Sequence, residues 1–551
     1  MKTLFSARER ERYLNQMAGE ELDLLVIGGG ITGAGIAWDA SVRGMKTGLL
    51  EMNDVASGTS SRSTKLIHGG LRYLKQGEVN LVREVGSERA LLHKSAPHLV
   101  DPIPMLLPIY KKGTYGYLAS AVGLYIYDWL AGVKRSERRK MYRKEQTMAL
   151  EPLFKTEDLK GSGYYYEYRT DDARLTVEVM KSARSRGAII ANHAKVEQFI
   201  YRRGKVAGVK AFDLASGNSY EIYAKKIVNA AGPWVDEIRK RDNSLHGKKL
   251  LLTKGVHLVV DYNKLPIRQA AYFDVPGGRM IFVIPRGSKT YIGTTDTVYK
   301  GGLEEPGITE DDVDYLVDAV NAAFPGVRLN KRDVETGWSG LRPLLWEEGK
   351  SPSEVSRKDE IILSDSGLIT IAGGKLTGFR KMAEKVVDLA AKQLQDENGK
   401  IYPPCTTDKE PISGGGGGSG AGYQQSIDAA MQLGGDMKLT RSEVADLASR
   451  YGANTTDVLK AVQSAEHFPT KKDQLLYGEI LYCIDHELTL NAVDFLLRRT
   501  GWLLFDRQRA EQERDAVVEM MASILDWSEL EVRRQQQLID DQIKEVWRSR
   551  A

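Results

Sequence analysis

The stretch that decides the fold of this chain is VIGGGITGAG, residues 26–35. It places Gly28, Gly30 and Gly33 at GxGxxG spacing, after the apolar run LDLLVI and at the start of a small-residue run. The first glycine permits a tight turn, the second lets a pyrophosphate approach the backbone, and the third lets a helix pack on a strand. Glycines alone are weak support for a nucleotide site, because tight turns also use glycine for purely conformational reasons.

The residues that follow strengthen the assignment. A second apolar run, KTGLLE, ends at Glu51, where a carboxylate can accept hydrogen bonds from a ribose diol. Residues 22–51 therefore have the order of strand, helix, second strand and acidic residue that a dinucleotide-binding unit requires. The sequence predicts a dinucleotide site with its pyrophosphate at the helix N-terminus.

The dinucleotide can be FAD or NAD. Two further apolar runs end in glycine far downstream: KKIVNAAG, residues 225–232, and GLITIAGG, residues 367–374. A flavin that stays bound needs contacts from several distant segments, whereas an exchangeable nicotinamide usually needs one nucleotide domain. We therefore expect FAD.

Length and composition narrow the class of protein. A chain of 551 residues is long enough for two or three domains. Lys plus Arg (78) barely exceeds Asp plus Glu (74), so net charge gives no support for a nucleic-acid partner. Cys405 and Cys483 lie far apart, which argues against a disulfide framework or a cysteine metal site, and we expect no metal. Residues 1–20 are charged and lack a signal-peptide core, so we expect a helix there and a cytoplasmic location.

The domain organisation follows from periodicity. The runs GVHLVVDY, RMIFVIPR and KTYIGTTD are typical of strands and predict a mostly antiparallel sheet covering one side of the nucleotide domain. We expect residues 21–400 to form a nucleotide domain interleaved with a cap, the cap mainly over residues 75–165 and 245–345. The glycine-rich run PISGGGGGSGAGY predicts a flexible connection over residues 401–422. Apolar residues at helical spacing predict a helical domain over residues 423–551.

Several motifs together resemble one family. In order along the chain, they are VIGGGITGAGIAWDAS, GTSSRSTKLIHGGLRYL, IVNAAGPWV, TKGVHLVV, YIGTTDTVYKG, SGLRPL and GGKLTGFRKMAE. They resemble the FAD-dependent glycerol-3-phosphate dehydrogenases of the bacterial aerobic type, through Lys392, and the helical tail is similar to that family's C-terminal domain. The resemblance implies an α/β plus α fold, with a Rossmann-like FAD-binding domain, an antiparallel substrate cap and a C-terminal helical domain. Related α-glycerophosphate oxidases share the motifs but typically carry an extra insertion that is not evident here.

The implied activity is oxidation of sn-glycerol 3-phosphate to dihydroxyacetone phosphate, with FAD reduced and a membrane quinone as final acceptor. This reaction needs a base for the hydroxyl proton and positive charge for the developing oxyanion. His257 interrupts an apolar strand, where a histidine is more often a structural residue; the family histidine that it matches faces the flavin. Arg342 is the expected partner beside it. Which of the two manages the proton stays open.

Four residues match family positions around the substrate's phosphate. They are Arg72, Tyr73, Arg357 and Lys375. An arginine fork bonds two phosphate oxygens at once, and a lysine adds compact charge. Any one basic residue is usually a solvated surface side chain, so the expectation rests on the four together.

A larger set is expected to hold the cofactor. It includes the glycine fingerprint and Glu51, the Ser/Thr-rich loop after the second strand, contacts near adenine, and the loop that opens the helix after residue 378. The residues, besides Gly28, Gly30, Gly33 and Glu51, are Met52, Thr59, Ser60, Ser61, Ser63, Thr64, Lys65, Leu66, His68, Val196, Ala231, Gly232, Gly374, Lys375, Leu376 and Thr377.

One segment points to a membrane surface. Residues 115–144 join an aromatic, apolar stretch to a basic cluster, and the stretch is too short and too polar for a spanning helix. A core helix followed by a solvated basic surface fits the pattern equally well. The resemblance favours peripheral association with an anionic lipid surface on the inner face of the membrane. The oligomeric state stays open, and a homodimer is one option.

Two other functions remain to be weighed. One is an α-glycerophosphate oxidase that passes electrons to oxygen and yields hydrogen peroxide. The other, from a different class, is a non-catalytic flavin-binding regulatory protein with a vestigial site. The presence of His257, Arg342, Arg357 and Lys375 together argues against decay of the site.

Overall fold

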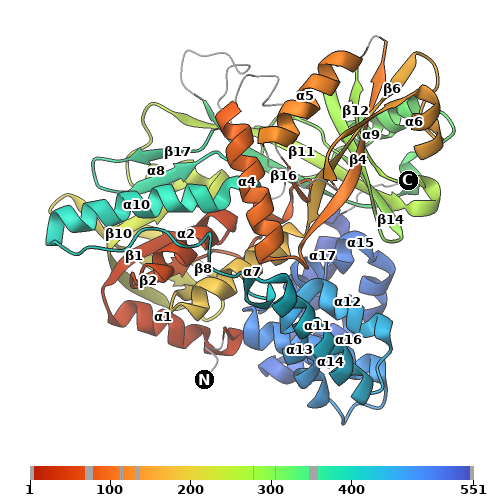
Figure 1. Cartoon of the computed structure of the whole chain (residues 1–551). Coiled ribbons are helices and arrows are strands. Elements are labelled where there is room, and N and C mark those ends of the chain that lie inside the picture. The colour runs from red at the N-terminus through yellow and green to blue at the C-terminus, as the bar shows by residue number, and fades with distance from the viewer. Residues whose placement is uncertain are drawn as a thin grey trace.

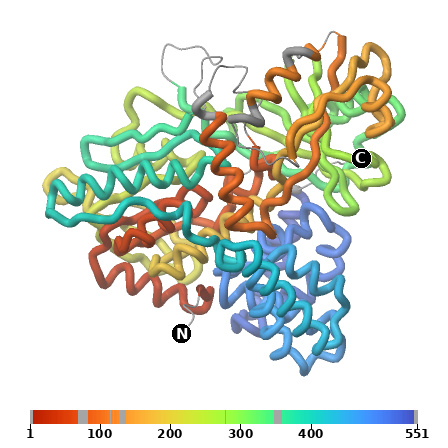
Figure 2. Tube along the Cα trace, viewed as in Figure 1, coloured from red at the N-terminus to blue at the C-terminus, as the bar shows by residue number. Residues whose placement is uncertain are grey.

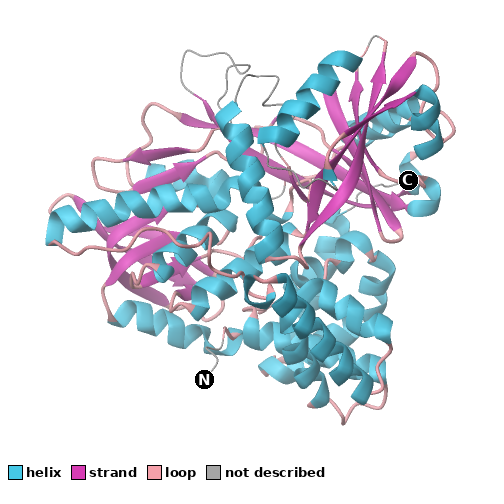
Figure 3. Cartoon of the chain, viewed as in Figure 1, coloured by secondary structure: helices cyan, strands magenta, loops and turns pink. Residues whose placement is uncertain are grey.

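The computed structural model describes residues 5–68, 79–111, 113, 116–130, 137–276, 278–304, 306–346 and 358–546. Two sheets lie side by side, and a bundle of helices lies below one of them and beside the lower part of the other (Figures 1 and 3). The order of the elements agrees with the α/β plus α fold that the sequence predicts.

The first sheet is the nucleotide-binding sheet, with strand order β17-β18-β10-β1-β2-β7 and β8 and β9 attached through β10. Strand β1 is parallel to β2 and β10, and β10 is parallel to β18. The bounds are β1 Leu22–Ile27, β2 Thr47–Leu50, β7 Ile189–Ala191, β8 Ala194–Arg202, β9 Lys205–Asp213, β10 Ser219–Asn229, β17 Glu360–Leu363 and β18 Ile369–Ala372. All six residues of β1 are buried, as expected for a central strand covered on both faces.

Helices from distant parts of the chain cover this sheet. Helix α2 (Ile31–Val42) packs against α7 (Asp172–Ser185) and α10 (Phe379–Asn398), which Figure 2 shows as early and late segments lying together. A Cβ on Gly35 of α2 would lie 2.8 Å from the Phe379 ring, so glycine is needed for this close approach. Helix α1 (Arg10–Gly19), within the expected N-terminal helix, contacts β7 and β10. Helix α8 is Val235–Arg241.

The second sheet is the cap, with strand order β15-β11-β14-β13-β12-β4-β6-β3, β16 beside β11 and β5 beside β6. Its pairings are antiparallel except for β12 with β4, so the mostly antiparallel cap is confirmed. The strands are β3 Leu66–Ile67, β4 Val100–Tyr110, β5 Lys140–Arg143, β6 Leu159–Thr170, β11 Lys249–Asp261, β12 Ala270–Val275, β13 Arg279–Arg286, β14 Lys289–Gly293, β15 Thr297–Val298 and β16 Val334–Trp346. Its helices are α4 Val79–Ser95, α5 Tyr117–Leu130, α6 Lys144–Leu150 and α9 Glu310–Ala323.

The C-terminal part is helical, as predicted. Its helices are α11 Gly420–Asp436, α12 Arg441–Tyr451, α13 Thr455–Gln463, α14 Lys471–His486, the π-helix η11 Asp494–Arg499, α15 Trp502–Phe505, α16 Arg507–Leu525 and α17 Glu529–Val546. They share a separate buried apolar core that includes Tyr451, Phe495 and Trp502.

The glycine-rich connection differs from the expectation of flexibility. A Cβ on Gly415 would lie 1.9 Å from the Ser95 carbonyl oxygen, and one on Gly416 would lie 2.3 Å from the Tyr423 Cα. Gly416 also has φ +64°, a conformation that favours glycine. These glycines therefore allow close packing of the connection against the end of α4 and the start of α11.

Buried ion pairs join the helical domain to the nucleotide domain. Arg499 donates to both carboxylate oxygens of Asp54, at 2.7 and 2.9 Å, and Arg498 donates to Asp54 at 2.6 Å. Nearby, Arg174 of α7 donates to Glu487 at 2.8 Å. The arginines hold the pKa values of Asp54 and Glu487 below the ordinary carboxyl range, against the opposing effect of burial.

Replacing Arg499 by Met is therefore expected to destabilise the fold strongly, because it leaves the buried Asp54 carboxylate short of charge compensation. Breaking such a pair costs roughly 3–5 kcal/mol. Chemical denaturation followed by circular dichroism measures the change. The matched control is Arg514→Met, which removes a partly exposed pair with Asp540 and should cost less than about 1 kcal/mol. Equal losses in the two variants would contradict the assigned role of the buried pairs.

Candidate functional site

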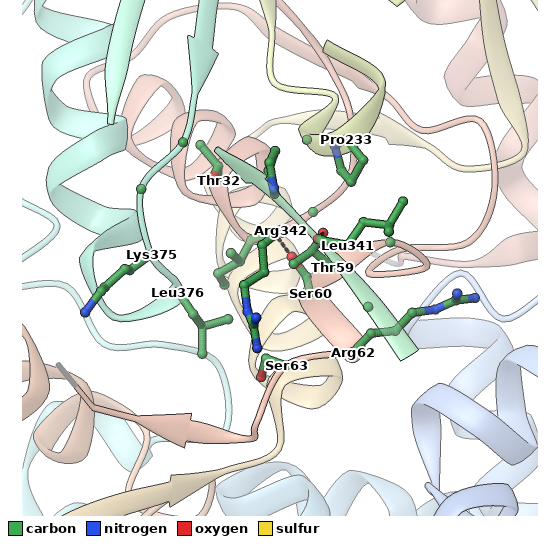
Figure 4. A pocket seen from close by; sticks show the side chains of 18 of the residues that line it. Thr32, Thr59, Ser60, Arg62, Ser63, Pro233, Leu341, Arg342, Lys375 and Leu376 are labelled. Carbon is green, nitrogen blue, oxygen red and sulfur yellow. Dashed lines mark hydrogen bonds between the residues drawn. The ribbon is translucent and has the colours of Figure 1, made fainter. Parts of the chain in front are cut away.

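A cavity of about 920 Å³ lies where the two sheets meet. Its walls come from the ends of β1, β2, β10 and β18 in the first sheet and from β11, β13 and β16 in the cap. The carboxyl ends of parallel strands are where open α/β sheets bind ligands. Figure 4 shows Arg342 projecting from β16 between Leu376 and the Ser60–Ser63 loop.

The glycine fingerprint has the geometry that the motif requires. Gly28 has φ +113°, and a Cβ there would lie 2.5 Å from the Ala230 carbonyl oxygen. A Cβ on Gly33 would lie 1.9 Å from the Gly28 carbonyl oxygen. Gly28 and Gly30 line the cavity, whereas Gly33 does not and instead allows α2 to pack against the turn after β1. The Ser60 hydroxyl accepts a hydrogen bond from the Ile31 amide at 2.9 Å.

Glu51 lies at the end of β2 on the cavity wall, next to Met52. Its carboxylate accepts hydrogen bonds from the amides of Gly29, at 2.6 Å, and Asn53, at 2.8 Å. Burial raises the pKa of Glu51, and these two hydrogen bonds oppose the shift. Each carboxylate oxygen has a second lone pair, so the group can still accept from a ribose diol.

The expected adenine contacts are brought to the same cavity. Val196, Ala231 and Gly232 all line it. The Val196 carbonyl accepts a hydrogen bond from Arg241, which also lines the cavity.

Most of the Ser/Thr-rich loop faces the cavity, but two of its residues do not. The lining members are Thr59, Ser60, Ser63, Thr64, Leu66 and His68. Ser61 and Lys65 lie behind the loop, and the Lys65 ammonium donates to Asp172 of α7 at 2.6 Å and to the Ser61 carbonyl at 3.0 Å. A buried carboxylate beneath the loop therefore holds the Lys65 charge outside the cavity lining, and a contact of Lys65 with the cofactor stays a prediction.

His68 is neutral at this site. Burial lowers its pKa to about 3, with smaller contributions from the charges of Lys375 and Arg342. Its ring meets Phe282 edge-on at 5.4 Å between centroids, and its carbonyl accepts from the Thr377 hydroxyl at 3.2 Å.

The loop before α10 forms the wall that faces the Ser/Thr-rich loop. Gly373 and Gly374 have φ +77° and +82°, and a Cβ on Gly374 would lie 2.5 Å from the Met382 sulfur. Gly374, Lys375, Leu376 and Thr377 all line the cavity. Amides at the start of a helix stabilise negative charge, so this wall suits an anionic group of a cofactor.

His257 and Arg342 lie on neighbouring strands and line the same cavity. Arg342 donates to Asp296 at 3.0 Å and to the Thr294 hydroxyl at 3.0 Å. A Cβ on Gly255 would lie 2.5 Å from an Arg342 Nη atom, so glycine leaves the guanidinium its space.

The imidazole of His257 is 1% exposed, and its Nε2 lies 3.0 Å from the Thr64 hydroxyl. Burial, together with the charges of Arg342 and Lys65, holds the pKa of His257 well below its ordinary value of 6.5. The ring is therefore unprotonated at working pH and has a lone pair that can take up a proton, although the lowered pKa makes it a weaker base than an ordinary histidine.

Three of the predicted residues lie outside the described part of the chain, and some residues that line the cavity were not predicted. Arg72, Tyr73 and Arg357 lie outside the described residues. Tyr272 and Phe282, whose rings stack at 4.1 Å, line the cavity but were not predicted. They are cross-strand neighbours of β12 and β13, and the sequence does not show which strands pair.

The residues present fit a bound flavin dinucleotide. One cavity includes Val196, where adenine contacts are expected, the glycine turn and the loop at Lys375. Gly28 and Gly374 line the cavity, and a Cβ on either would collide with neighbouring protein atoms, so glycine lets the wall pack closely at both places. Within the described chain, Nδ1 of the buried His257 ring has no hydrogen-bond partner, which suits a group that meets a ligand.

Comparison with known proteins gives concordant matches. The model of the FAD dependent oxidoreductase family matches residues 23–380, and the C-terminal domain of alpha-glycerophosphate oxidase matches residues 405–532. An aerobic glycerol-3-phosphate dehydrogenase of Bacillus subtilis is 51% identical over 96% of both chains. One from Staphylococcus aureus is 49% identical over 98% of both.

Solved structures agree with these matches. A glycerol-3-phosphate dehydrogenase from Bacillus halodurans complexed with FAD has TM-score 0.85 and 46% identity, over 98% of both chains. The FAD-bound L-alpha-glycerophosphate oxidase of Mycoplasma pneumoniae has TM-score 0.54 and 17% identity, over 67% of this chain and 95% of that one. The second match shows a shared fold alone.

Proposed function

This chain belongs to the FAD dependent oxidoreductase family, among its aerobic glycerol-3-phosphate dehydrogenases, and we propose that it oxidises sn-glycerol 3-phosphate to dihydroxyacetone phosphate and passes the electrons to a membrane quinone. Its cofactor is FAD. The observation that carries the proposed chemistry is the placement of a neutral, buried His257 and the cation Arg342 on one wall of the cofactor cavity.

The proposed roles follow from the chemistry of a secondary alcohol. FAD, when bound, takes up the two electrons and the hydrogen that leave the alcohol carbon. His257 accepts the hydroxyl proton, because its imidazole is neutral before the reaction. Arg342, held in place by Asp296 and Thr294, binds the substrate oxygen and stabilises its alkoxide character.

The phosphate is proposed to lie at the Lys375 end of the cavity. Lys375 lines the cavity, and its charge contributes to the lowered pKa of His68 across the site. Arg72, Tyr73 and Arg357 remain proposed phosphate ligands by resemblance. A cluster of fixed cations suits a phosphate dianion and would reject uncharged glycerol.

The pH dependence of flavin reduction tests the state of His257. An ordinary histidine becomes protonated as the pH falls through 6.5 and ceases to be a base. Since the pKa of His257 is lowered, its imidazole stays neutral through that range. The reduction rate constant at saturating substrate is therefore expected to stay roughly constant between about pH 8 and 6. Stopped-flow absorbance measures it, and a steep fall with a midpoint near 6.5 would contradict the assignment.

A steady-state assay tests the overall function and the acceptor. The purified protein is mixed with glycerol 3-phosphate and either a soluble quinone analogue or oxygen alone. The proposal predicts one dihydroxyacetone phosphate per quinone reduced and little hydrogen peroxide. Fast oxygen consumption with peroxide formation would instead identify an oxidase, and the absence of any ketone product would favour a non-catalytic flavoprotein.

We also propose that the protein associates peripherally with the inner face of the cell membrane through α5. Val122 and Tyr125 of this helix are exposed, at 58% and 60%, and the Arg139 guanidinium lies 5.0 Å from the Tyr125 ring. Among the described residues, no helix is long and apolar enough to cross a membrane. Exposed apolar side chains beside basic ones suit an anionic lipid surface.

Vesicle sedimentation tests this association. The protein is expected to sediment with vesicles of anionic phospholipid at low salt and much less with zwitterionic vesicles. Replacing Val122 by Asp should weaken sedimentation several-fold, because a carboxylate would face the anionic surface. The control Leu214→Asp changes another exposed apolar residue, on the nucleotide domain, and should sediment normally. Equal sedimentation of both variants would contradict the proposed surface.

A further inference from the structure

The imidazole of His257 occupies a slot between its two cross-strand neighbours. Strand β11 pairs His257 with Trp338 of β16 on one side and with Gly293 of β14 on the other. The indole of Trp338 stacks on the imidazole, with centroids 4.8 Å apart and an interplanar angle of 9°. On the other side, a Cβ on Gly293 would lie 2.2 Å from Cδ2 of the imidazole. The space between the two strands is therefore no wider than one ring.

The Trp338 wall of this slot is itself fixed. Its indole is 5% exposed, and Nε1 donates to the Ser63 carbonyl at 3.0 Å. Tyr291 and Phe505 contact the indole on its other sides, each with centroids 5.7 Å from that of Trp338. An indole that is hydrogen-bonded at one edge and packed on its flanks cannot rotate away from the imidazole.

One edge of the imidazole is fixed as well. Nε2 lies 3.0 Å from the Thr64 hydroxyl, in the same loop that provides the Ser63 carbonyl for Trp338. The loop, the indole and the imidazole therefore form one connected unit. The stacked ring fixes the plane of the imidazole, and the Thr64 hydroxyl fixes its rotation within that plane.

The stack also affects the charged form of the ring. The neutral imidazole becomes a cation when it accepts the substrate proton, and a cation over an indole face is stabilised by the ring quadrupole. Lys65 already lies 5.3 Å from the Trp338 ring centroid, with its charge compensated by Asp172 at 2.6 Å. The indole therefore stabilises the protonated imidazole more than the neutral imidazole. A contact that strengthens during proton transfer raises the rate of the chemical step without tightening substrate binding.

We propose that Trp338 is a positioning residue for His257: together with Gly293 and Thr64 it holds the imidazole in the orientation that accepts the substrate proton and stabilises the imidazolium that results. This inference rests on the proposed role of His257 as the base. Neither the motif resemblance nor the family match assigns a role to Trp338. From sequence alone, a tryptophan in an apolar strand is ordinarily interpreted as a core residue.

Anaerobic stopped-flow reduction of the FAD-loaded protein by glycerol 3-phosphate tests the proposal. Trp338→Leu is expected to lower the limiting rate constant roughly 10-fold or more, with a half-saturating substrate concentration within about 3-fold of the original. Trp338→Phe, which keeps a stacked ring, should recover most of the rate. The matched control is Phe324→Leu, which removes a buried ring from the apolar core of the cap, outside the cavity lining, and should leave the rate constant within about 2-fold.

A second variant approaches the slot from its other wall. Gly293→Ala leaves Trp338 intact, but its methyl group would displace the imidazole, so the same slow reduction is expected with an unchanged flavin spectrum. If Trp338→Leu fails to retain FAD, the reduction rate of Gly293→Ala tests the positioning role instead. An original rate in Gly293→Ala, or equal losses in Trp338→Leu and Phe324→Leu, would overturn the positioning role. If the unmodified protein itself were not reduced, the proposed function would fail instead.

Discussion

Replacing His257 by Ala is expected to slow reduction of the bound flavin by glycerol 3-phosphate roughly 10²- to 10⁴-fold, which is the usual contribution of a general base. The physical reason is that His257 is neutral and buried on the cavity wall. Among the described residues that line the cavity, His68 carries the one other imidazole. Substrate affinity should change little, because the proposed phosphate ligands, which supply most of the binding, are unchanged. Stopped-flow absorbance under anaerobic conditions gives both quantities.

The control for this variant is His257→Gln. Glutamine keeps a polar group near the Thr64 hydroxyl and most of the side-chain volume, but it cannot take up a proton at this pH. It should therefore be nearly as slow as His257→Ala. Recovery of the rate by glutamine would show that His257 is a packing or hydrogen-bonding residue and would move the base elsewhere, for instance to His68.

Replacing Arg342 by Met is expected to lower kcat/KM roughly 10²- to 10³-fold, in the range seen when one donor to a developing oxyanion is lost. The change also leaves the Asp296 carboxylate, 3.0 Å from the guanidinium, without that cation beside the substrate oxygen. Most of the loss should therefore appear in the chemical step rather than in substrate affinity. Steady-state kinetics with a quinone analogue, combined with single-turnover reduction, separate the two.

Arg342→Lys is the informative companion. Lysine retains the charge but cannot donate to Asp296, Thr294 and the substrate oxygen with one planar fork. It should recover part of the rate and leave kcat/KM still well below the original. Full recovery by lysine would reduce the role of Arg342 to charge alone, and a change confined to substrate affinity would place it with the phosphate ligands.

The sequence predicts those parts of the site that are formed by residues close together in the chain. The fingerprint at Gly28, Gly30 and Gly33 is local in the chain, and Gly28 and Gly33 make the close backbone approaches that their positions in the motif require. Glu51 follows from the end of the next strand for the same reason. Likewise, helical periodicity identifies the C-terminal domain, whose apolar residues form their own core.

The parts that the sequence does not predict depend on distant partners. No local pattern predicts the ion pair between the Lys65 ammonium and Asp172, a residue of α7. The slot around His257 depends on the register of β11 with β14 and β16, which no local pattern specifies. The glycine-rich pattern near residue 415 predicts flexibility, and the close approach of Ser95 and Tyr423 backbone atoms is not visible in it, because these residues lie in other segments.

The most direct test of the central claim is anaerobic mixing of the FAD-loaded protein with glycerol 3-phosphate, glycerol or an amino acid, while the absorbance of oxidised flavin is followed. The cation-lined cavity and the His257–Arg342 pair predict that only the phosphorylated substrate bleaches the flavin rapidly. Rapid bleaching by the amino acid or by glycerol, or none by glycerol 3-phosphate, would contradict the proposed function.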